Sequence, residues 1–295
     1  MGSAVSVIIA TRNRSVLLAR MLRSLDRALL AAEVDAQVVV VDNGSSDATA
    51  AVVADWIRCA PGRTSICVPQ PGKAHALNRG LDLVQAPLLA FTDDDVELRS
   101  DWLREIMRFV AQHPHYSAAV GRVLLPLDVT DPTLQARVRH YRTIPLFDGG
   151  DTVRDDRHLY GANMMVRRAV FERVGPFNER LGPGASGLHE DGDLARRILQ
   201  AGMRIGYMPA ATVYHVVEPE RLTFEYFRSL HLRDARSRFE MDPQGNWLRS
   251  LLHWFGAVAI FGLWSMFRDP HQRLRARGRM ISHAELLRLR WQRNS

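Results

Sequence analysis

Three consecutive carboxylates, Asp93, Asp94 and Asp95, follow a short apolar stretch at residues 88–92. The stretch is typical of a buried strand, and ligands bind beyond the carboxyl ends of strands in an open parallel sheet. Adjacent carboxylates repel one another unless a cation or solvent compensates them. A divalent ion completed by substrate phosphates is a common use of such a group. A solvated turn that caps a helix is the alternative interpretation.

A second acidic group contains Glu190, Asp191 and Asp193 and follows a glycine-rich segment at 182–187. It begins a predicted helix, where acids compensate the helix dipole. Three acids in four residues exceed what capping requires, so one of them is a candidate general base. Farther along, His215 ends a predicted strand, from which an imidazole can reach a metal ion.

The elements that must position these groups alternate between strands and helices. Strands are predicted at 4–10, 38–41, 66–68 and 88–92, with helical apolar spacing between them. This alternation indicates βαβ units and a parallel sheet, and therefore an α/β fold. The later predicted strands are 118–125, 160–166, 204–209 and 211–214. The polar segment 128–157 is predicted to be a lid or binding loop.

Further polar side chains end or follow the early strands, and they are Thr11, Asn13, Asp42, Lys73 and Asn78. Asp42 can accept a hydrogen bond from the ring N–H of a pyrimidine. Lys73 can meet a phosphate, although a solvated surface lysine is the alternative. Neither the dinucleotide motif G-x-G-x-x-G nor the P-loop motif occurs, which argues against hydride transfer and P-loop chemistry.

Length and composition indicate one large domain, or one domain with an appendage. The chain has 295 residues, 46% of them hydrophobic and 24% charged. Two cysteines, Cys59 and Cys67, fit a reducing compartment better than a disulfide framework. The first residues lack a signal-peptide pattern, so a cytoplasmic location is expected.

The C-terminal part combines apolar and basic character. Segment 251–267 is apolar but shorter than the roughly 20 residues that span a bilayer. Eight arginines within 268–295 leave this tail a net charge of +6. We expect residues 247–295 to contact an anionic membrane peripherally, with Trp247, Trp254 and Trp264 at its interface. A buried core or oligomer-interface helix is the alternative.

Two further expectations concern this part of the chain. The pattern Ser282-His283-Ala284-Glu285 predicts a capping box that begins a last basic helix. The arginines accompany an apolar run and no recognition motif, which argues against nucleic acid as a partner.

With these motifs in order, the chain resembles the family 2 glycosyltransferases, inverting enzymes of the GT-A fold. The resemblance covers about residues 5–215. It rests on V-S-V-I-I-A-T-R-N-R, V-V-V-V-D-N-G-S-S-D, A-L-N-R-G-L, F-T-D-D-D, G-A-N-M-M and E-D-G-D-L-A-R-R. It implies a catalytic domain at 1–217, with a nucleotide-sugar half at about 1–97 and an acceptor half at about 98–217, followed by a helical region at 218–295.

The resemblance also implies roles for the residues above. Asp191 would be the general base and Glu190 would orient the acceptor. Mn²⁺ or Mg²⁺ would be held by Asp95, Asp93 and His215. The donor would be bound by Thr11, Asn13, Asp42, Lys73, Asn78, Asp93 and Asp94.

Two departures from the family refine the expectation. Leu77 stands where the family often has arginine, and the glutamine of Q-x-x-R-W is missing before Trp291. The chain also lacks the transmembrane helices of processive synthases, which favours transfer of a single sugar.

The resemblance therefore implies metal-dependent, inverting transfer from a nucleoside-diphosphate sugar, with UDP as the expected nucleotide. The expected acceptor is a lipid-linked or envelope glycan intermediate at the cytoplasmic face of the membrane. The alternatives are a soluble secondary-metabolite acceptor, nucleotidyl transfer to a sugar phosphate, and a catalytically silent membrane-bound scaffold. The sugar, the acceptor and the oligomeric state stay open.

Overall fold

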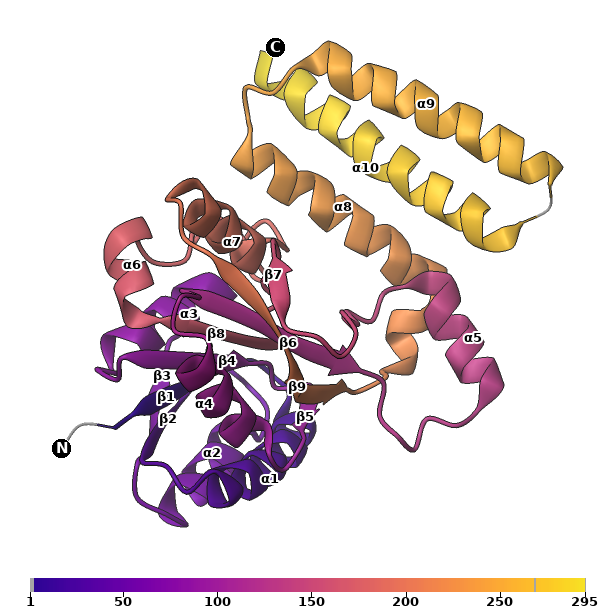
Figure 1. Ribbon diagram of the computed structural model, residues 1–295. Helices are drawn as coiled ribbons and strands as arrows, with labels where there is room; N and C mark the ends of the chain where they lie inside the picture. Colours follow the sequence, from indigo (N-terminus) through magenta and orange to yellow (C-terminus); the bar gives the residue numbers. More distant parts are fainter. Residues whose placement is uncertain (1–2, 268, 295) are drawn as a thin grey trace. The chain divides into compact units, whose positions relative to one another are not determined.

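The computed structural model describes residues 3–267 and 269–294 (Figure 1). The chain divides into two units. The first contains Met1–Pro126, Leu146–Glu179 and Glu190–Val216, and the second contains Leu127–Pro145, Arg180–His189 and Val217–Ser295. The chain enters the second unit for the last time at Val217, where a boundary was expected. Two earlier segments, Leu127–Pro145 and Arg180–His189, also belong to the second unit.

The first unit is built on one sheet, with strand order β3-β2-β1-β4-β8-β6-β9-β5 and β7 paired to β9. The strands are β1 (Val5–Thr11), β2 (Ala36–Asp42), β3 (Arg63–Cys67), β4 (Leu88–Thr92), β5 (Val96–Leu98), β6 (Ala118–Leu124), β7 (Arg154–Asp156), β8 (Asn163–Arg167) and β9 (Ile205–His215). The pairs among β1–β4 and the β6–β9 pair are parallel, and β8, β5 and β7 pair in the antiparallel sense. The expected α/β class is confirmed.

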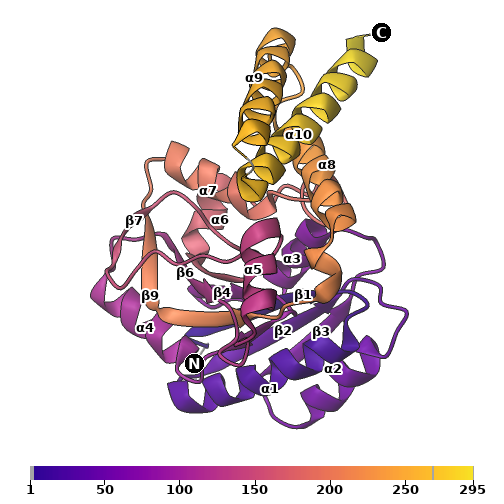
Figure 2. The ribbon, with the colours of Figure 1, turned by 90° about the vertical axis from the view of Figure 1, so that its right-hand side faces the viewer.

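Helices cover both faces of this sheet because its strands are apolar on both sides. The helices are α1 (Ser15–Ala32), α2 (Thr49–Arg58), α3 (Lys73–Asp82), α4 (Trp102–Gln112), α6 (Arg168–Val174) and α7 (Glu190–Gln200). Val7 and Ile9 pack in one core with residues of α1, α2 and α4, while Ile8 packs in another with residues of α3, α6 and α7. Figure 2 shows α1 and α2 on one side of the early strands.

The structure differs from the predicted local structure in three places. Segments 204–209 and 211–214 form one strand, β9, and the register shift between Gly121 and Arg122 of β6 falls at residues 209–211 of β9. A bulge accommodates a proline, which cannot donate to the ladder. Strand β5 was not expected. Segment 128–157 contains β7 and α5 (Pro132–Tyr141), and Asp131 caps α5 by accepting from the backbone N–H of Thr133 at 2.9 Å.

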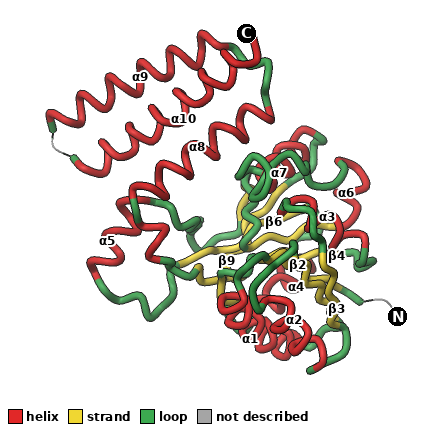
Figure 3. The backbone as a smooth tube through the Cα atoms, turned by 180° about the vertical axis from the view of Figure 1, so that it is seen from behind, coloured by secondary structure: helices red, strands yellow, loops and turns green. Residues whose placement is uncertain are grey.

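The second unit is helical, with η1 (Pro219–Leu222), α8 (Phe224–Met241), α9 (Trp247–Met266) and α10 (Pro270–Asn294) in addition to α5. Helix α10 contacts both α8 and α9 and lies between them (Figure 3). The predicted helix start at Ser282 is wrong, because α10 runs through this residue. The Ser282 hydroxyl donates across to the carbonyl oxygen of His231 in α8 at 3.1 Å instead of capping a helix. No helix within the described residues is long and apolar enough to traverse a bilayer.

Candidate functional site

Strand register gathers the predicted site residues at one edge of the sheet. Thr11 of β1 is opposite Asp42 of β2, and β4 ends one residue before Asp93. The Thr11 hydroxyl donates to Asp94 Oδ2 at 2.7 Å. Thr11, expected at the nucleotide, therefore also anchors the middle residue of the acidic group.

Lys73 joins the two acidic groups of the sequence. Its Nζ lies 2.6 Å from Asp93 Oδ1 and 3.4 Å from Glu190 Oε1, and its side chain is 20% exposed. Burial disfavours the charged form, but the carboxylates of Asp93 and Glu190 raise the pKa of Lys73 above its usual range. Burial also raises the pKa of Glu190, and Lys73 opposes that rise. Lys73 is thus a paired cation inside the site and not a solvated surface residue.

The carboxylate of Asp191 and the ammonium group of Lys73 both lie close to Gly161. Its Oδ2 accepts from the backbone N–H of Gly161 at 2.9 Å, and its Oδ1 accepts from the N–H of Gly192 at 2.7 Å. A Cβ on Gly161 would lie 3.1 Å from Lys73 Nζ and 3.7 Å from Asp93 Oδ1. Gly161 therefore marks the point where Lys73 and the carboxylates of Asp93 and Asp191 converge.

Asp95 and His215 meet because β5 and β9 pair with Val96 opposite His215. His215 Nε2 lies 3.5 Å from Asp95 Oδ1, and both side chains are buried. His215 Nδ1 lies 2.9 Å from the carbonyl oxygen of Val216, so in a neutral ring Nδ1 donates and Nε2 presents its lone pair to Asp95. Two electron-pair donors that face each other fit a cation.

Asp94 and Asp95 have a partner that the sequence did not single out, Arg14 at the start of α1. Its Nη1 lies 2.6 Å from Asp95 Oδ2 and 3.3 Å from Asp94 Oδ1. Burial, followed by the charge of Asp95, raises the pKa of Asp94 to about 7, and Arg14 and Thr11 oppose the shift. The only signal in the sequence was that Arg14 follows the end of the first predicted strand, in the segment T-R-N-R.

The remaining predicted donor residues shape loops. Asn13 Oδ1 accepts from the N–H of Ser46 at 2.7 Å, and Asp42 Oδ1 accepts from the N–H of Ser45 at 2.9 Å. Asn78 donates to the carbonyl oxygen of Phe177 at 3.0 Å and accepts from its N–H at 2.9 Å. The structure thus places Asn78 against the segment that follows α6.

Asn43, a residue that the sequence motifs did not single out, positions the loop before Lys73. Its Nδ2 donates to the carbonyl oxygens of Val68 and Gln70 at 2.9 and 2.7 Å, and its Oδ1 accepts from the N–H of Gly72 at 2.9 Å. Gly72 has a φ of 145°, which favours glycine. Asn43 therefore sets where α3 begins.

The protein side chains alone supply only part of the ligand set that a divalent metal ion needs. Within the described residues, no three His, Cys, Asp or Glu side chains gather into a ligand set. Asp93 lies against Lys73, whereas Asp95 and His215 face each other. One carboxylate and one imidazole suit an ion whose other ligands are substrate phosphate and water.

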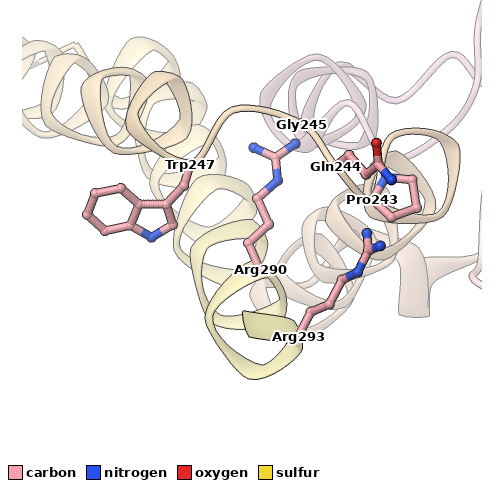
Figure 4. Close-up of a pocket in the computed structure, with 6 residues that line it drawn as sticks. All are labelled: Pro243, Gln244, Gly245, Trp247, Arg290 and Arg293. Carbon is pink, nitrogen blue, oxygen red and sulfur yellow. The ribbon is translucent and has the colours of Figure 1, made fainter. Parts of the chain in front are cut away.

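The second unit contains a separate cavity of about 230 Å³ (Figure 4). Its lining residues are Pro243, Gln244, Gly245, Trp247, Arg290 and Arg293. Arg290 is buried, and its Nη1 donates to the carbonyl oxygen of Asn246 at 3.0 Å. None of the residues expected for donor or acceptor lines this cavity, and its two guanidinium groups give it basic character.

Comparison with known proteins places the chain among glycosyltransferases. The model of the family described as "Glycosyl transferase family 2" matches residues 6–175. The pre-mycofactocin glycosyltransferase of Mycobacterium tuberculosis is 28% identical over 218 residues, which are 72% of this chain and 42% of the relative. The glucosyl-dolichyl phosphate glucuronosyltransferase of Haloferax volcanii is 26% identical over 165 residues, which are 54% of this chain and 52% of the relative. The chain thus spans about half the length of these relatives or less.

The fold is shared with a solved structure. A mannosyltransferase from Pyrobaculum calidifontis, solved in complex with GDP-Man and Mn²⁺, matches with a TM-score of 0.56 at 21% identity. The match covers 99% of this chain and 74% of that one. At this level of identity the likeness concerns the fold, and it confirms the GT-A architecture expected for the first unit.

Proposed function

Because the chain belongs to glycosyl transferase family 2, we propose that it moves a single sugar from a nucleoside-diphosphate sugar to an acceptor hydroxyl with inversion. The observation that carries the proposal is the position of Lys73. Its ammonium group links Asp93, at the end of a nucleotide-side strand, to Glu190, beside the candidate base Asp191. Donor and acceptor chemistry therefore share one site.

Asp191 is suited to take the proton from the acceptor. Two backbone N–H groups donate to its carboxylate at the start of α7, and they hold it in one orientation. As the acceptor oxygen bonds to the anomeric carbon, the bond to the diphosphate oxygen breaks and the hydroxyl proton passes to Asp191. The single displacement inverts the anomeric centre and needs no covalent nucleophile. Glu190, held by Lys73, orients the acceptor.

On the donor side, Asp42 would accept from the ring N–H of uracil, and the positive charge of Lys73 would face the diphosphate. Asp95 and His215 would hold the divalent ion together with phosphate oxygens. When bound, this ion neutralises charge on the leaving nucleoside diphosphate. The Mn²⁺ in the complex of the structurally similar mannosyltransferase supports a divalent ion as cofactor.

Calorimetric titration with UDP, GDP and dTDP, each with and without Mn²⁺, tests the donor proposal. We expect UDP to bind best and to require the metal, and Asp95→Asn to abolish the metal-dependent part. If GDP binds best instead, the proposed nucleotide is wrong but the proposed reaction stands. If no nucleotide binds, the enzyme proposal fails and a silent scaffold replaces it.

For the acceptor we propose a lipid-linked glycan intermediate at the cytoplasmic face of an anionic membrane. Apolar side chains recur every three or four positions on the exposed face of α9, and they are Leu248, Leu252, Phe255, Ala259, Leu263 and Met266. The small residues Ser250 and Ala257 are buried on another face. An uninterrupted exposed apolar stripe suits an interface with lipid.

The charge of α10 complements an anionic surface. Its exposed arginines are Arg273, Arg275, Arg277, Arg279, Arg288 and Arg293, and each basic residue near an anionic bilayer contributes attraction. The cavity of about 230 Å³ beside Trp247 is lined by Arg290 and Arg293, and it is our candidate contact for a phosphate headgroup. The dolichyl phosphate in the name of the Haloferax relative supports a lipid-linked acceptor.

Vesicle co-sedimentation tests this second part. We expect binding to vesicles that contain phosphatidylglycerol, weak binding to pure phosphatidylcholine, and loss of binding in Leu252→Asp/Phe255→Asp. Leu30→Asp is the matched control, because Leu30 is 80% exposed on α1 of the first unit. Equal recovery of the double variant and the wild type with the anionic vesicles would favour a soluble acceptor.

A further inference from the structure

The guanidinium group of Arg14 rests on the carboxylates that the proposed function assigns to metal and donor. Its Nη1 lies 2.6 Å from Asp95 Oδ2 and 3.3 Å from Asp94 Oδ1. The side chains of Asp94 and Asp95 are 9% and 6% exposed, whereas that of Arg14 is 32% exposed. Arg14 is therefore the more accessible member of a largely buried charge cluster.

The backbone at Arg14 is fixed, which leaves its side chain as the part that can move. Asn13 has a φ of 52° and is fastened through its N–H to Ser45 Oγ at 2.9 Å. The N–H of Arg14 donates to Thr49 Oγ1 at 3.3 Å. The guanidinium group reaches Asp95 from this anchored turn through a long, flexible side chain.

The two oxygens of Asp95 face different groups. Oδ2 meets Arg14, and Oδ1 lies 3.5 Å from His215 Nε2. A metal ion that binds between Asp95 and His215 shares its carboxylate with a guanidinium group that is already there. Two cations at one carboxylate repel each other, and the repulsion is strong where water is largely excluded. The negative charge of a bound diphosphate offsets it.

We infer that Arg14 is a positioning residue that makes metal binding depend on nucleotide. This inference rests on the metal site of the proposed function. Without nucleotide, Arg14 compensates Asp95 and lowers its affinity for a free divalent ion. With nucleotide bound, the diphosphate supplies negative charge to both Arg14 and the metal. The coupling is reciprocal, so metal also strengthens nucleotide binding by the same factor.

Titration of Mn²⁺ followed by electron paramagnetic resonance, with and without UDP, measures this coupling without any turnover. For the wild type we expect Mn²⁺ to bind about tenfold tighter, or more, in the presence of UDP. In Arg14→Gln we expect free Mn²⁺ to bind about tenfold tighter than in the wild type, and the effect of UDP to shrink. Arg14→Lys keeps a point charge and is expected to lie between the two.

Arg12→Gln is the matched control, because Arg12 is an exposed arginine in the same turn. Its loss removes the same net charge, and Mn²⁺ affinity should stay at the wild-type value. If Arg14→Gln binds free Mn²⁺ equally or more weakly than the wild type, the inference is overturned.

The wild-type protein provides a test that does not depend on any variant folding. Equal Mn²⁺ affinity with and without UDP, in a protein that binds UDP, also overturns the inference. If no nucleotide binds to any of the proteins, the proposed function fails instead, and the free Mn²⁺ titration of Arg14→Gln still tests the role of Arg14.

Discussion

The two acidic groups, Asp93–Asp95 and Glu190–Asp193, look alike as sequence and differ in the folded protein. In the first, cationic side chains from distant parts of the chain contact the carboxylates: Lys73 meets Asp93, and Arg14 meets Asp94 and Asp95. In the second, the acids divide three ways. Glu190 meets Lys73, Asp191 accepts from backbone N–H groups, and Asp193 pairs with Arg196 and Arg197 of its own helix.

The difference follows from the element that carries each group. A chain leaving a strand directs successive side chains to different sides, so three neighbours meet partners from different strands and loops. Successive residues in a helix are turned by about 100°, so the acids of α7 face the site, the loop at Gly161 and the helix itself in turn. Acidic residues that are adjacent in sequence can therefore have separate roles.

The largest effect should come from Asp191, whose carboxylate accepts from the backbone N–H groups of Gly161 and Gly192. Asp191→Asn removes the proposed base, and the rate of nucleotide release on sugar transfer should fall about 10²–10⁴-fold. Nucleotide affinity from calorimetry should stay within about threefold of the wild type, since nothing on the donor side changes. A variant with near wild-type turnover would remove Asp191 from the proposed role.

The link between the two groups should matter most for stability. Lys73→Met leaves Asp93 and Glu190 near each other without their shared cation, and the free energy of unfolding should fall by about 3 kcal/mol. Chemical denaturation measures the change. Lys73→Met/Glu190→Gln removes one of the two carboxylates as well and should recover part of the loss. If the single variant were as stable as the wild type, Lys73 would not be the residue that joins the groups.

A smaller effect should separate Asp193 from its neighbours. Its carboxylate pairs with Arg196 at 2.6 Å and with Arg197 at 2.8 Å, and both pairs lie within α7. Asp193→Asn should lower the free energy of unfolding by about 1–2 kcal/mol and leave turnover per folded molecule unchanged. A loss of turnover comparable to that of Asp191→Asn would place Asp193 in the reaction and end the proposed division of roles.

The smallest effect concerns pH. Burial raises the pKa of Glu190 in the folded state, so the folded protein holds this proton more tightly than the unfolded chain. The contribution of Glu190 to stability is therefore highest below the ordinary glutamate pKa of about 4.3 and is lost as the pH rises through the raised folded-state pKa. Glu190→Gln should flatten this part of the pH–stability profile measured by thermal unfolding. If the profile of Glu190→Gln keeps the wild-type slope, a group other than Glu190 causes that slope.

Much of the sheet and several candidate site residues could be predicted, because apolar runs indicate buried strands and polar residues follow their ends. The β-branched run at 38–41 is buried on both sheet faces, and strand ends carry Thr11, Asp42 and Asp93 in the expected order. Helix α5 within segment 128–157 was not predicted, because its sequence has little apolar periodicity. The capping-box prediction at Ser282 failed because the hydroxyl has a partner in α8, which sequence spacing does not show.

The sequence by itself determined the first four strands with the helices between them, the family, and the acidic residues on which the proposed chemistry depends. These are properties of short segments, since periodicity and motif spacing act over a few residues. Only the tertiary structure decided which cation meets which carboxylate. Arg14 is some 80 positions from Asp95, and Lys73 is more than 100 positions from Glu190. Such pairs depend on strand register and on the path of loops, and local residue patterns carry no direct record of either.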